Sequence, residues 1–280
     1  MLELLSPAGS LDALHAAVCN GANAVYLGAD AFNARSGARN FTLEELPDVV
    51  RYCHVRGVAV HLTLNTLVTD REMPHAAEYI AAATRAGVDA FIVQDLGIVS
   101  LCRQIAPKVA LHASTQMSLH SLEGVRQAAQ MGISRAVLAR ELPRNLIAFI
   151  CRNSPIEIEV FVHGALCMCY SGQCYMSSVI GRRSGNRGQC AQPCRLPYGY
   201  DRFEEKYPLR LRDNCLIRYL SELDRMGVAS IKLEGRMKRP EYVATVTGIY
   251  RRALDGEGIG REQMEMLRAA FSRQGFTQSY

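Results

Sequence analysis

The chain has 280 residues, of which 49% are apolar, and its formal charge is +5. That length and apolar content suit one large domain with a substantial core, and so mild a basic charge does not by itself indicate a nucleic-acid partner. No run of about 18 uncharged apolar residues is present, and the opening MLELLSPAGS lacks the basic start of a signal peptide. We therefore expect a cytoplasmic protein with no membrane partner.

A repeated unit runs through the chain, in which a helical pattern ends in glycine and a short apolar, β-rich run follows. Its copies are NGANAVYLG, RGVAVHLTLN, AGVDAFIVQD, MGISRAVLARE and MGVASIKLEG. Glycine fits the left-handed position that ends a helix, and runs this continuously apolar are typical of strands buried on both faces. Strands are predicted within 2–9, 20–28, 56–65, 86–95, 109–116, 131–141, 156–164 and 226–235, and helices within 11–20, 43–56, 72–86, 98–105, 122–131, 144–152, 213–226 and 241–254.

Eight strands alternating with eight helices predict a single domain over residues 1–280 with a TIM-like (β/α)8 barrel fold, and a doubly wound open sheet is the alternative. The alternation is interrupted between predicted strands seven and eight by a cysteine-rich insertion, residues 165–212, which also contains many Gly, Ser and Arg residues. Because barrels carry active sites at the carboxyl ends of their strands, we expect this insertion at the active-site end. The ending FSRQGFTQSY does not resemble a finished domain edge, which leaves open a longer protein of which this is the N-terminal part.

Polar side chains gather where the predicted strands end, often two or three together, as in QD, STQ, ARE and EGR. One polar residue per strand end is ordinary loop polarity, whereas groups of this kind favour a ligand pocket. The candidates for substrate binding here are Asn65, Gln94, Thr115, Gln116 and Arg140. The candidate acids and bases are Asp95, Glu141, Glu234 and His163, although ion pairing with the adjacent arginines is the default for the carboxylates and orientation of the insertion by a hydrogen bond is the alternative for the histidine.

The ten cysteines are not expected to form disulfides in the cytoplasm. Four of them, Cys19, Cys53, Cys102 and Cys151, are scattered through apolar helical patterns and are predicted to be buried, as is Cys215 in the predicted helix 213–226.

A second set of cysteines falls within the insertion. Cys167, Cys174, Cys190 and Cys194 are separated by six, fifteen and three residues, and they predict one metal centre at the barrel mouth. Only the last pair has the spacing of a zinc knuckle, whereas iron–sulfur clusters accept looser spacings, so an iron–sulfur cluster is favoured and zinc stays open. Only Met168 separates Cys169 from Cys167, and we take Cys169 as a non-ligand.

Basic residues flank the cysteines. Residues 181–195 contain Arg182, Arg183, Arg187 and Arg195 without an acid, and residues 232–239 contain Lys232, Arg236, Lys238 and Arg239 against one glutamate. This distribution suits phosphate contacts to RNA, for which Arg182, Arg183, Arg187, Arg236 and Lys238 are the candidates. The alternatives are a solvated rim, support for the metal centre, or a small carboxylate held by a single arginine, for which Arg236 is the candidate.

The run EVFVHGALCMCYSGQCYMS at 159–177 resembles the signature of the U32 family, long called U32 peptidases. The resemblance continues through RSGNRGQCAQPCRLPY and IKLEGRMKRPEYVA, and it includes the opening LLSPAGSLDAL, NGANAVYLGADAFNAR and LHASTQ, so that it spans essentially the whole chain. Within the family, SGQCYMS, NRG-x-C and CRLPY are most similar to the branch of the ribosomal-RNA cytidine hydroxylase and its collagenase-like relatives.

The resemblance implies a [4Fe–4S] cluster held by the cysteines at 167, 174, 190 and 194, and an oxygen-independent hydroxylase of RNA bases that depends on prephenate. Other members act on tRNA wobble uridine or on a ubiquinone precursor. A collagenase-like peptidase is one alternative, although the HExxH and GxSxG motifs are missing from the sequence and only Cys167 or Cys169 with His163 offers a nucleophile and a base. A non-catalytic iron–sulfur scaffold is the other alternative, and the polar strand ends speak against it.

Overall fold

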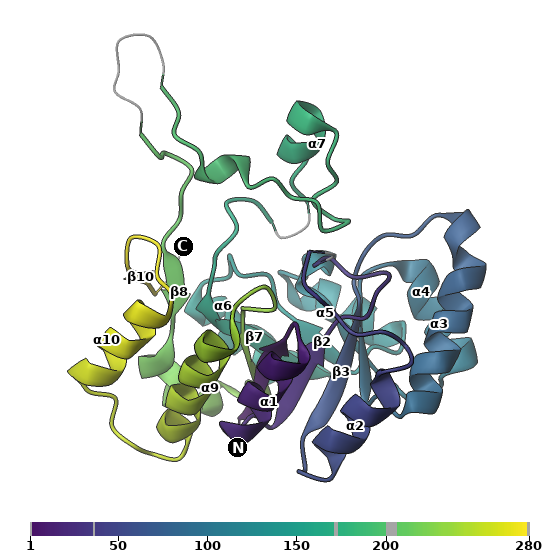
Figure 1. The fold of residues 1–280 in the computed structure, drawn as a ribbon, viewed down its shortest axis with the longest axis horizontal. Helices are drawn as coiled ribbons and strands as arrows, with labels where there is room; N and C mark the ends of the chain where they lie inside the picture. The colour runs from purple at the N-terminus through teal and green to yellow at the C-terminus, as the bar shows by residue number, and fades with distance from the viewer. Residues whose placement is uncertain (1, 36, 171–172, 200–205, 279–280) are drawn as a thin grey trace.

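Eight parallel strands close into a barrel in the computed structural model, which describes residues 2–35, 37–170, 173–199 and 206–278 (Figure 1). The barrel strands are β1 (Glu3–Ala8), β2 (Ala24–Leu27), β3 (Ala59–Leu64), β4 (Ala90–Val93), β5 (Ala110–Ala113), β6 (Arg135–Val137), β7 (Glu157–Gly164) and β9 (Ser230–Leu233). Each of β1 to β6 pairs in parallel with the next strand, and β9 pairs with both β1 and β7, which closes the ring. The predicted (β/α)8 barrel is confirmed, and the open sheet is wrong.

Helices surround the barrel and connect its strands. They are α1 (Leu11–Cys19), α2 (Leu46–His54), α3 (Met73–Ala86), α4 (Leu96–Ile105), α5 (Leu122–Gln130), α6 (Arg144–Asn153), α8 (Leu220–Met226) and α9 (Pro240–Leu254). Local chemistry fixes their ends: Ser10 caps α1 by accepting a hydrogen bond from the Ala13 amide. Gly87 and Gly227 end α3 and α8 in the left-handed conformation, with φ of 89° and 90°, as the glycine pattern predicts.

The chain departs from the prediction after β7. Residues 165–212 carry the short helix α7 (Met176–Gly181), which lies beyond the ends of the strands, apart from the ring of helices (Figure 1). The predicted helix 213–226 is wrong at its start, because Asp213–Cys215 forms β8, antiparallel to the end of β7. After α9 come α10 (Arg261–Ala270) and β10 (Phe276–Thr277), and β10 pairs with β8. Short 3-10 turns occupy Asp70–Glu72, Thr115–Met117, Pro193–Arg195 and Ile217–Tyr219.

The main apolar core lies between the strands and the helices, whereas the barrel interior is largely polar. Inside the barrel, a small apolar layer of Leu5, Ala24, Tyr26 and Ile92 is the exception. Towards the amino ends of the strands, Lys232 donates to Glu159 at 2.9 Å, and Glu159 also pairs with Arg135. The prediction that Lys232 belongs to a basic rim is therefore wrong, since its side chain is buried in the interior.

The scattered cysteines follow their predicted burial in most cases. Cys53, Cys102 and Cys215 are buried and Cys151 is half-buried, but Cys19 is exposed, because it is the last residue of α1 and its thiol faces the Tyr52 hydroxyl at 3.9 Å. Cys215 lies in β8 rather than in a helix. No helix in the part of the chain that the structure describes is long and apolar enough to cross a bilayer.

Candidate active site at the carboxyl end of the barrel

Side-chain amides connect the ends of β3, β4 and β5. Asn65 follows β3 and donates to the Gln116 side-chain oxygen at 2.7 Å, while Gln94 follows β4 and donates to the Gln116 carbonyl at 3.2 Å. The segment after β7 joins this network, since Asn186 donates to the Gln94 side chain at 2.8 Å and Gln173 donates to the Gln116 carbonyl at 3.0 Å. The structure thus brings three predicted substrate-binding residues together, and their polar atoms contact the segment that carries the cysteines.

Thr115 and Asp95 lie at the same end of the barrel but are engaged with the backbone. The Thr115 hydroxyl donates to the Leu138 carbonyl at 3.5 Å. One Asp95 oxygen caps α4 by accepting from the Gly97 and Ile98 amides at 2.8 and 3.1 Å, and the other accepts from Val68. An Asp95 carboxylate that holds a helix start is a positioning group, so its predicted role as an acid or base has no support here.

Three arginines surround one carboxylate in the barrel mouth. Arg140 donates to Glu234 at 2.9 Å and to the Ala165 carbonyl at 2.6 Å, and Arg35 lies 3.6 Å from the same Glu234 oxygen. Burial alone would raise the pKa of Glu234, but Arg35 and Arg140 outweigh that effect and lower the pKa to about 2. Glu234 is therefore ionised at neutral pH and suits an ion-pair partner or a hydrogen-bond acceptor, whereas so low a pKa makes it a weak base and no proton donor.

Arg236 is the third arginine of this cluster. Its guanidinium is buried and donates to Thr63 and to Asn33, each at 2.9 Å. Burial lowers the pKa of Arg236 to about 10, with Arg35 as the next cause. The mouth therefore holds three guanidinium groups against one carboxylate, an excess of positive charge suited to an anion. Sequence reasoning missed Arg35 and Asn33, although both lie in the FNAR stretch that follows the first copy of the repeat, NGANAVYLG.

His163 does not reach the mouth. It is 1% exposed, and its ring packs against Tyr242 and Tyr250 of α9 and Phe276 of β10. Its Nδ1 atom lies 3.3 Å from the Tyr250 hydroxyl, and burial lowers the pKa of His163 to about 3. This placement behind β7 gives no support to the acid–base role, and the hydrogen-bond partner of His163 belongs to α9 and not to the insertion that it was expected to orient. Glu141 is half-buried, with one side-chain oxygen that has no hydrogen-bond partner in the described part of the chain.

The four clustered cysteines lie within electrostatic reach of one another. Burial raises the pKa of Cys167 and of Cys194, and the thiols of Cys174 and Cys190 add to the increase in both. Cys190 accepts from the Gln192 amide at 3.4 Å. Across the described residues, no three Cys, His, Asp or Glu side chains are gathered closely enough to hold a metal ion. The four thiols are the donor type that a thiolate-bound metal or iron–sulfur cluster requires, but their placement in the described residues does not bring three of them close enough to share one ion.

The predicted phosphate-binding residues divide into two groups. Arg187 pairs with Glu72, and Arg236 is buried, so both are engaged inside the protein. Arg182 and Arg183 are exposed at the end of α7, and Lys238 is half-buried beside the C-terminal segment. The last three are the ones placed to meet an external ligand.

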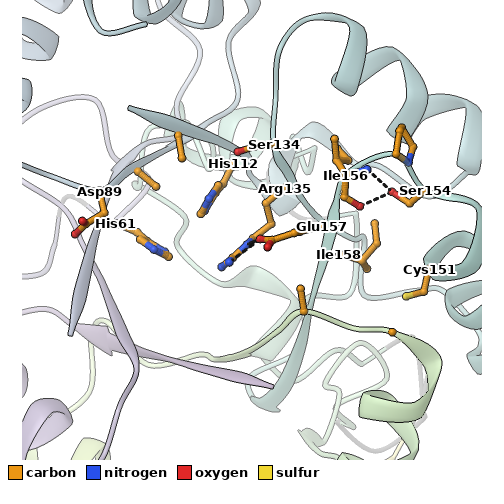
Figure 2. A pocket seen from close by; sticks show the side chains of 15 residues that line it. His61, Asp89, His112, Ser134, Arg135, Cys151, Ser154, Ile156, Glu157 and Ile158 are labelled. Carbon is orange, nitrogen blue, oxygen red and sulfur yellow. Dashed lines mark hydrogen bonds and ion pairs between the residues drawn. The ribbon is translucent and has the colours of Figure 1, made fainter. Parts of the chain in front are cut away.

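A hollow of about 760 Å³ lies at the opposite end of the barrel, where the strands begin (Figure 2). His61 and His112 point into it together with Arg135 and Glu157. Burial lowers the pKa of both histidines, so they are neutral at pH 7. The hollow contains none of the predicted site residues, and the alternating patterns HLTLN and LHAS are the sequence signal that could have placed these histidines inside the barrel.

The protein is therefore a parallel (β/α)8 barrel with a charged mouth and a cysteine-bearing segment above that mouth. Residues 9–280 match the model of peptidase family U32, and the chain belongs to that family. It is 41% identical over 278 residues to the 23S rRNA 5-hydroxycytidine C2501 synthase of Escherichia coli (strain K12). The aligned residues cover 97% of this chain and 42% of that protein. It is 38% identical over 265 residues to tRNA hydroxylation protein P1 of Bacillus subtilis (strain 168), covering 90% of this chain and 63% of that protein.

Other relatives carry a different name. The chain is 35% identical over 306 residues to a collagenase of Porphyromonas gingivalis (strain ATCC BAA-308 / W83), covering 99% of this chain and 73% of that protein. Among solved structures, the U32 peptidase Mk0906 is similar with a TM-score of 0.59 at 13% identity, over 84% of this chain and 93% of that one. At this identity the likeness supports the barrel fold alone. The chain spans less than two thirds of the length of the two hydroxylation-related proteins.

Proposed function

We propose that this chain is the barrel part of an iron–sulfur-dependent, oxygen-independent hydroxylase of RNA bases that uses prephenate as a co-substrate. The observation that carries the proposal is the mouth itself, where Arg35, Arg140 and Arg236 face one ionised carboxylate, Glu234, directly below the cysteine-bearing segment. An excess of guanidinium groups in a buried mouth suits an anionic substrate. The names of the relatives from Escherichia coli and Bacillus subtilis support RNA as the substrate and hydroxylation as the reaction.

In this proposal the cysteines at 167, 174, 190 and 194 hold a [4Fe–4S] cluster. Such a cluster supplies one-electron transfer at a potential that the surrounding protein tunes. The chain's own residues bind and orient the reactants. Arg140, which bridges Glu234 and the Ala165 carbonyl, links the mouth to the segment that carries Cys167, and the ionised Glu234 accepts hydrogen bonds that hold the arginines in place. An RNA substrate of this kind places the protein in the cytoplasm.

The peptidase alternative lacks the cysteine–histidine pair that it would need for catalysis. A cysteine peptidase would need a histidine beside Cys167 or Cys169, and His163 instead packs behind β7 against Tyr242 and Tyr250. A non-catalytic scaffold has no use for three arginines converging on one buried carboxylate. Both alternatives predict that RNA is left unmodified.

The test is anaerobic incubation of the reconstituted protein with unmodified RNA and prephenate, followed by mass analysis of the nucleosides. The proposal predicts a pyrimidine nucleoside that has gained one oxygen atom. It predicts that Arg140→Gln lowers the yield at least tenfold, whereas Arg225→Gln, an exposed change on α8, leaves it unaltered. RNA that stays unmodified while gelatin is cleaved would reject the hydroxylase in favour of the peptidase.

A further inference from the structure

Four basic side chains gather at the base of the cysteine-bearing segment, near enough to the Glu234 cluster for Glu234 to act on one of them, Lys238. Arg195 and Arg210 come from residues 165–212, Lys238 follows β9, and Arg273 precedes β10. They lie close enough for Arg273 and Arg195 to lower the pKa of Lys238, after the larger effect of burial, to about 8. Burial likewise lowers the pKa of Arg273, with Arg195 as the next cause.

The C-terminal segment delivers Arg273 to this place. β10 pairs with β8, with Phe276 opposite Asp213, and the Arg273 amide donates to the Asp213 carboxylate at 2.9 Å. Phe271 supports the cations, since the Lys238 ammonium lies 2.7 Å from its ring centre and the Arg273 guanidinium 5.1 Å away. The pairing of two short strands therefore fixes a basic side chain next to the cysteines.

Among the described residues, these four cations outnumber the carboxylates within ion-pair distance of them. Asp213, 1% exposed, is the carboxylate nearest Arg273, and its oxygen lies 3.9 Å from the guanidinium. In the described part of the chain, no other carboxylate lies within ion-pair distance of these four cations. One buried guanidinium nitrogen of Arg195 and one of Arg273 have no hydrogen-bond partner there. Buried donors without partners are costly unless a ligand satisfies them.

Aromatic side chains stand next to these cations. Arg210 lies over the ring of Tyr207 at 5.3 Å, and Tyr207 and Tyr198 are 46% and 37% exposed. Exposed aromatic rings beside arginines are the combination that binds single-stranded RNA, because bases stack on the rings while phosphates contact the cations.

We propose that Arg195, Arg210, Lys238 and Arg273 form a binding site for a backbone phosphate of the RNA, next to the nucleotide that enters the barrel mouth. This site presupposes the RNA substrate proposed above, and it is distinct from the anion site formed by Arg35, Arg140 and Arg236. The phosphate site holds the RNA strand, and the anion site formed by Arg35, Arg140 and Arg236 faces the reacting groups.

The experiment measures binding of a short fluorescent single-stranded RNA by anisotropy over a series of salt concentrations, with no turnover required. The test variants are Lys238→Gln, Arg273→Gln and Arg210→Gln, and the matched control is Arg225→Gln, which removes the same charge from the exposed surface of α8. Each test variant should weaken binding roughly three- to tenfold and lower the log–log salt slope by about 0.7, the value for one phosphate contact to a single strand. Arg273→Lys should retain most of the affinity.

The outcomes separate the two proposals. If all three variants bind RNA as tightly as wild type, the phosphate site is overturned and the hydroxylase proposal is unaffected. Variants that lose prephenate binding while RNA binding persists also overturn it, because the ligand is then a carboxylate. Wild-type protein that binds no RNA overturns both. Arg210 is half-buried and pairs with no carboxylate in the described residues, so Arg210→Gln keeps the test valid if Arg273→Gln fails to fold.

Discussion

Arg187 and Glu72 form a two-point ion pair, with guanidinium-to-carboxylate distances of 2.6 and 2.7 Å. Glu72 ends the 3-10 turn before α3, and Arg187 lies in the segment after β7, 115 residues further along the chain. The hydrogen bonds from Arg187 lower the pKa of Glu72 to about 2. The pair therefore attaches the cysteine-bearing segment to the barrel, a structural role for a residue whose position in the sequence suggested phosphate binding.

Breaking this pair should loosen the segment without weakening RNA binding. Arg187→Gln is expected to speed proteolysis between β7 and β8, and a double-mutant cycle with Glu72→Gln should give a coupling energy of about 1 kcal/mol, because both groups are about one third exposed. Limited proteolysis and urea unfolding measure the two effects. An RNA salt slope that falls in Arg187→Gln as far as in Lys238→Gln would return Arg187 to the phosphate contacts.

Removing the charge of Glu234 should be far more damaging. Glu234→Gln leaves Arg35, Arg140 and Arg236 facing one another in a partly buried site, where the Arg35 side chain is 38% exposed, so the cost should be somewhat below the roughly 3 kcal/mol of a fully buried charge cluster that loses one partner. Glu222→Gln is the control, because Glu222 pairs with an exposed arginine and its loss should cost less than about 1 kcal/mol. Equal urea midpoints for the two variants would contradict the charge cluster.

The Glu234 variant also carries a pH signature. The pKa of Glu234 is lowered to about 2 in the folded protein, whereas an unfolded glutamate titrates near about 4.3. Its contribution to the free energy of unfolding is therefore present above about pH 4.3 and is lost as the pH falls towards 2. Wild type should lose more stability than Glu234→Gln across that interval, and parallel pH curves would refute the ionised state of this carboxylate.

His163 should make the protein sensitive to mild acid. Its folded pKa is about 3, and an unfolded histidine titrates near about 6.5, so between these values the unfolded state binds more protons. Stability should fall as the pH drops below 6.5, by up to about 1.4 kcal/mol per pH unit from this residue. The groups that face it are Tyr242, Tyr250 and Phe276, none of which titrates in this range.

The comparison of wild type with His163→Gln isolates this effect from the other buried histidines, His61 and His112. Urea unfolding at pH 7 and pH 5 should show that the variant loses about 2 kcal/mol less than wild type between the two conditions. A variant with the same pH dependence as wild type would mean that His163 is already protonated or solvated in the folded protein.

The barrel could be predicted because its signals are local. A glycine that ends each helix, such as Gly87 or Gly227, and the apolar run after it both lie within a few residues of one another. β8 was mistaken for the start of a helix because its three residues pair with His163 and Gly164 of β7 and with β10, contacts that no local pattern encodes.

The proximity of some candidate residues could be predicted, but not their roles. The polar strand ends predicted that Asn65, Gln94 and Gln116 lie together, because strand order alone places them at one end of the barrel. The partners of the arginines could not be read from the sequence. Arg236 bonds to Thr63, which is 173 residues away, and only the closed ring of strands makes them neighbours. Arg35 was missed for the same reason.

Iron and sulfide analysis, with a visible absorption spectrum, on protein purified without oxygen decides whether the four cysteines hold an iron–sulfur cluster. We expect a brown protein with about four iron and four sulfide ions per chain, bleached by Cys174→Ser and unchanged by Cys169→Ser. A colourless protein that carries stoichiometric zinc after the same handling, with the zinc lost in Cys174→Ser, would contradict the iron–sulfur hydroxylase.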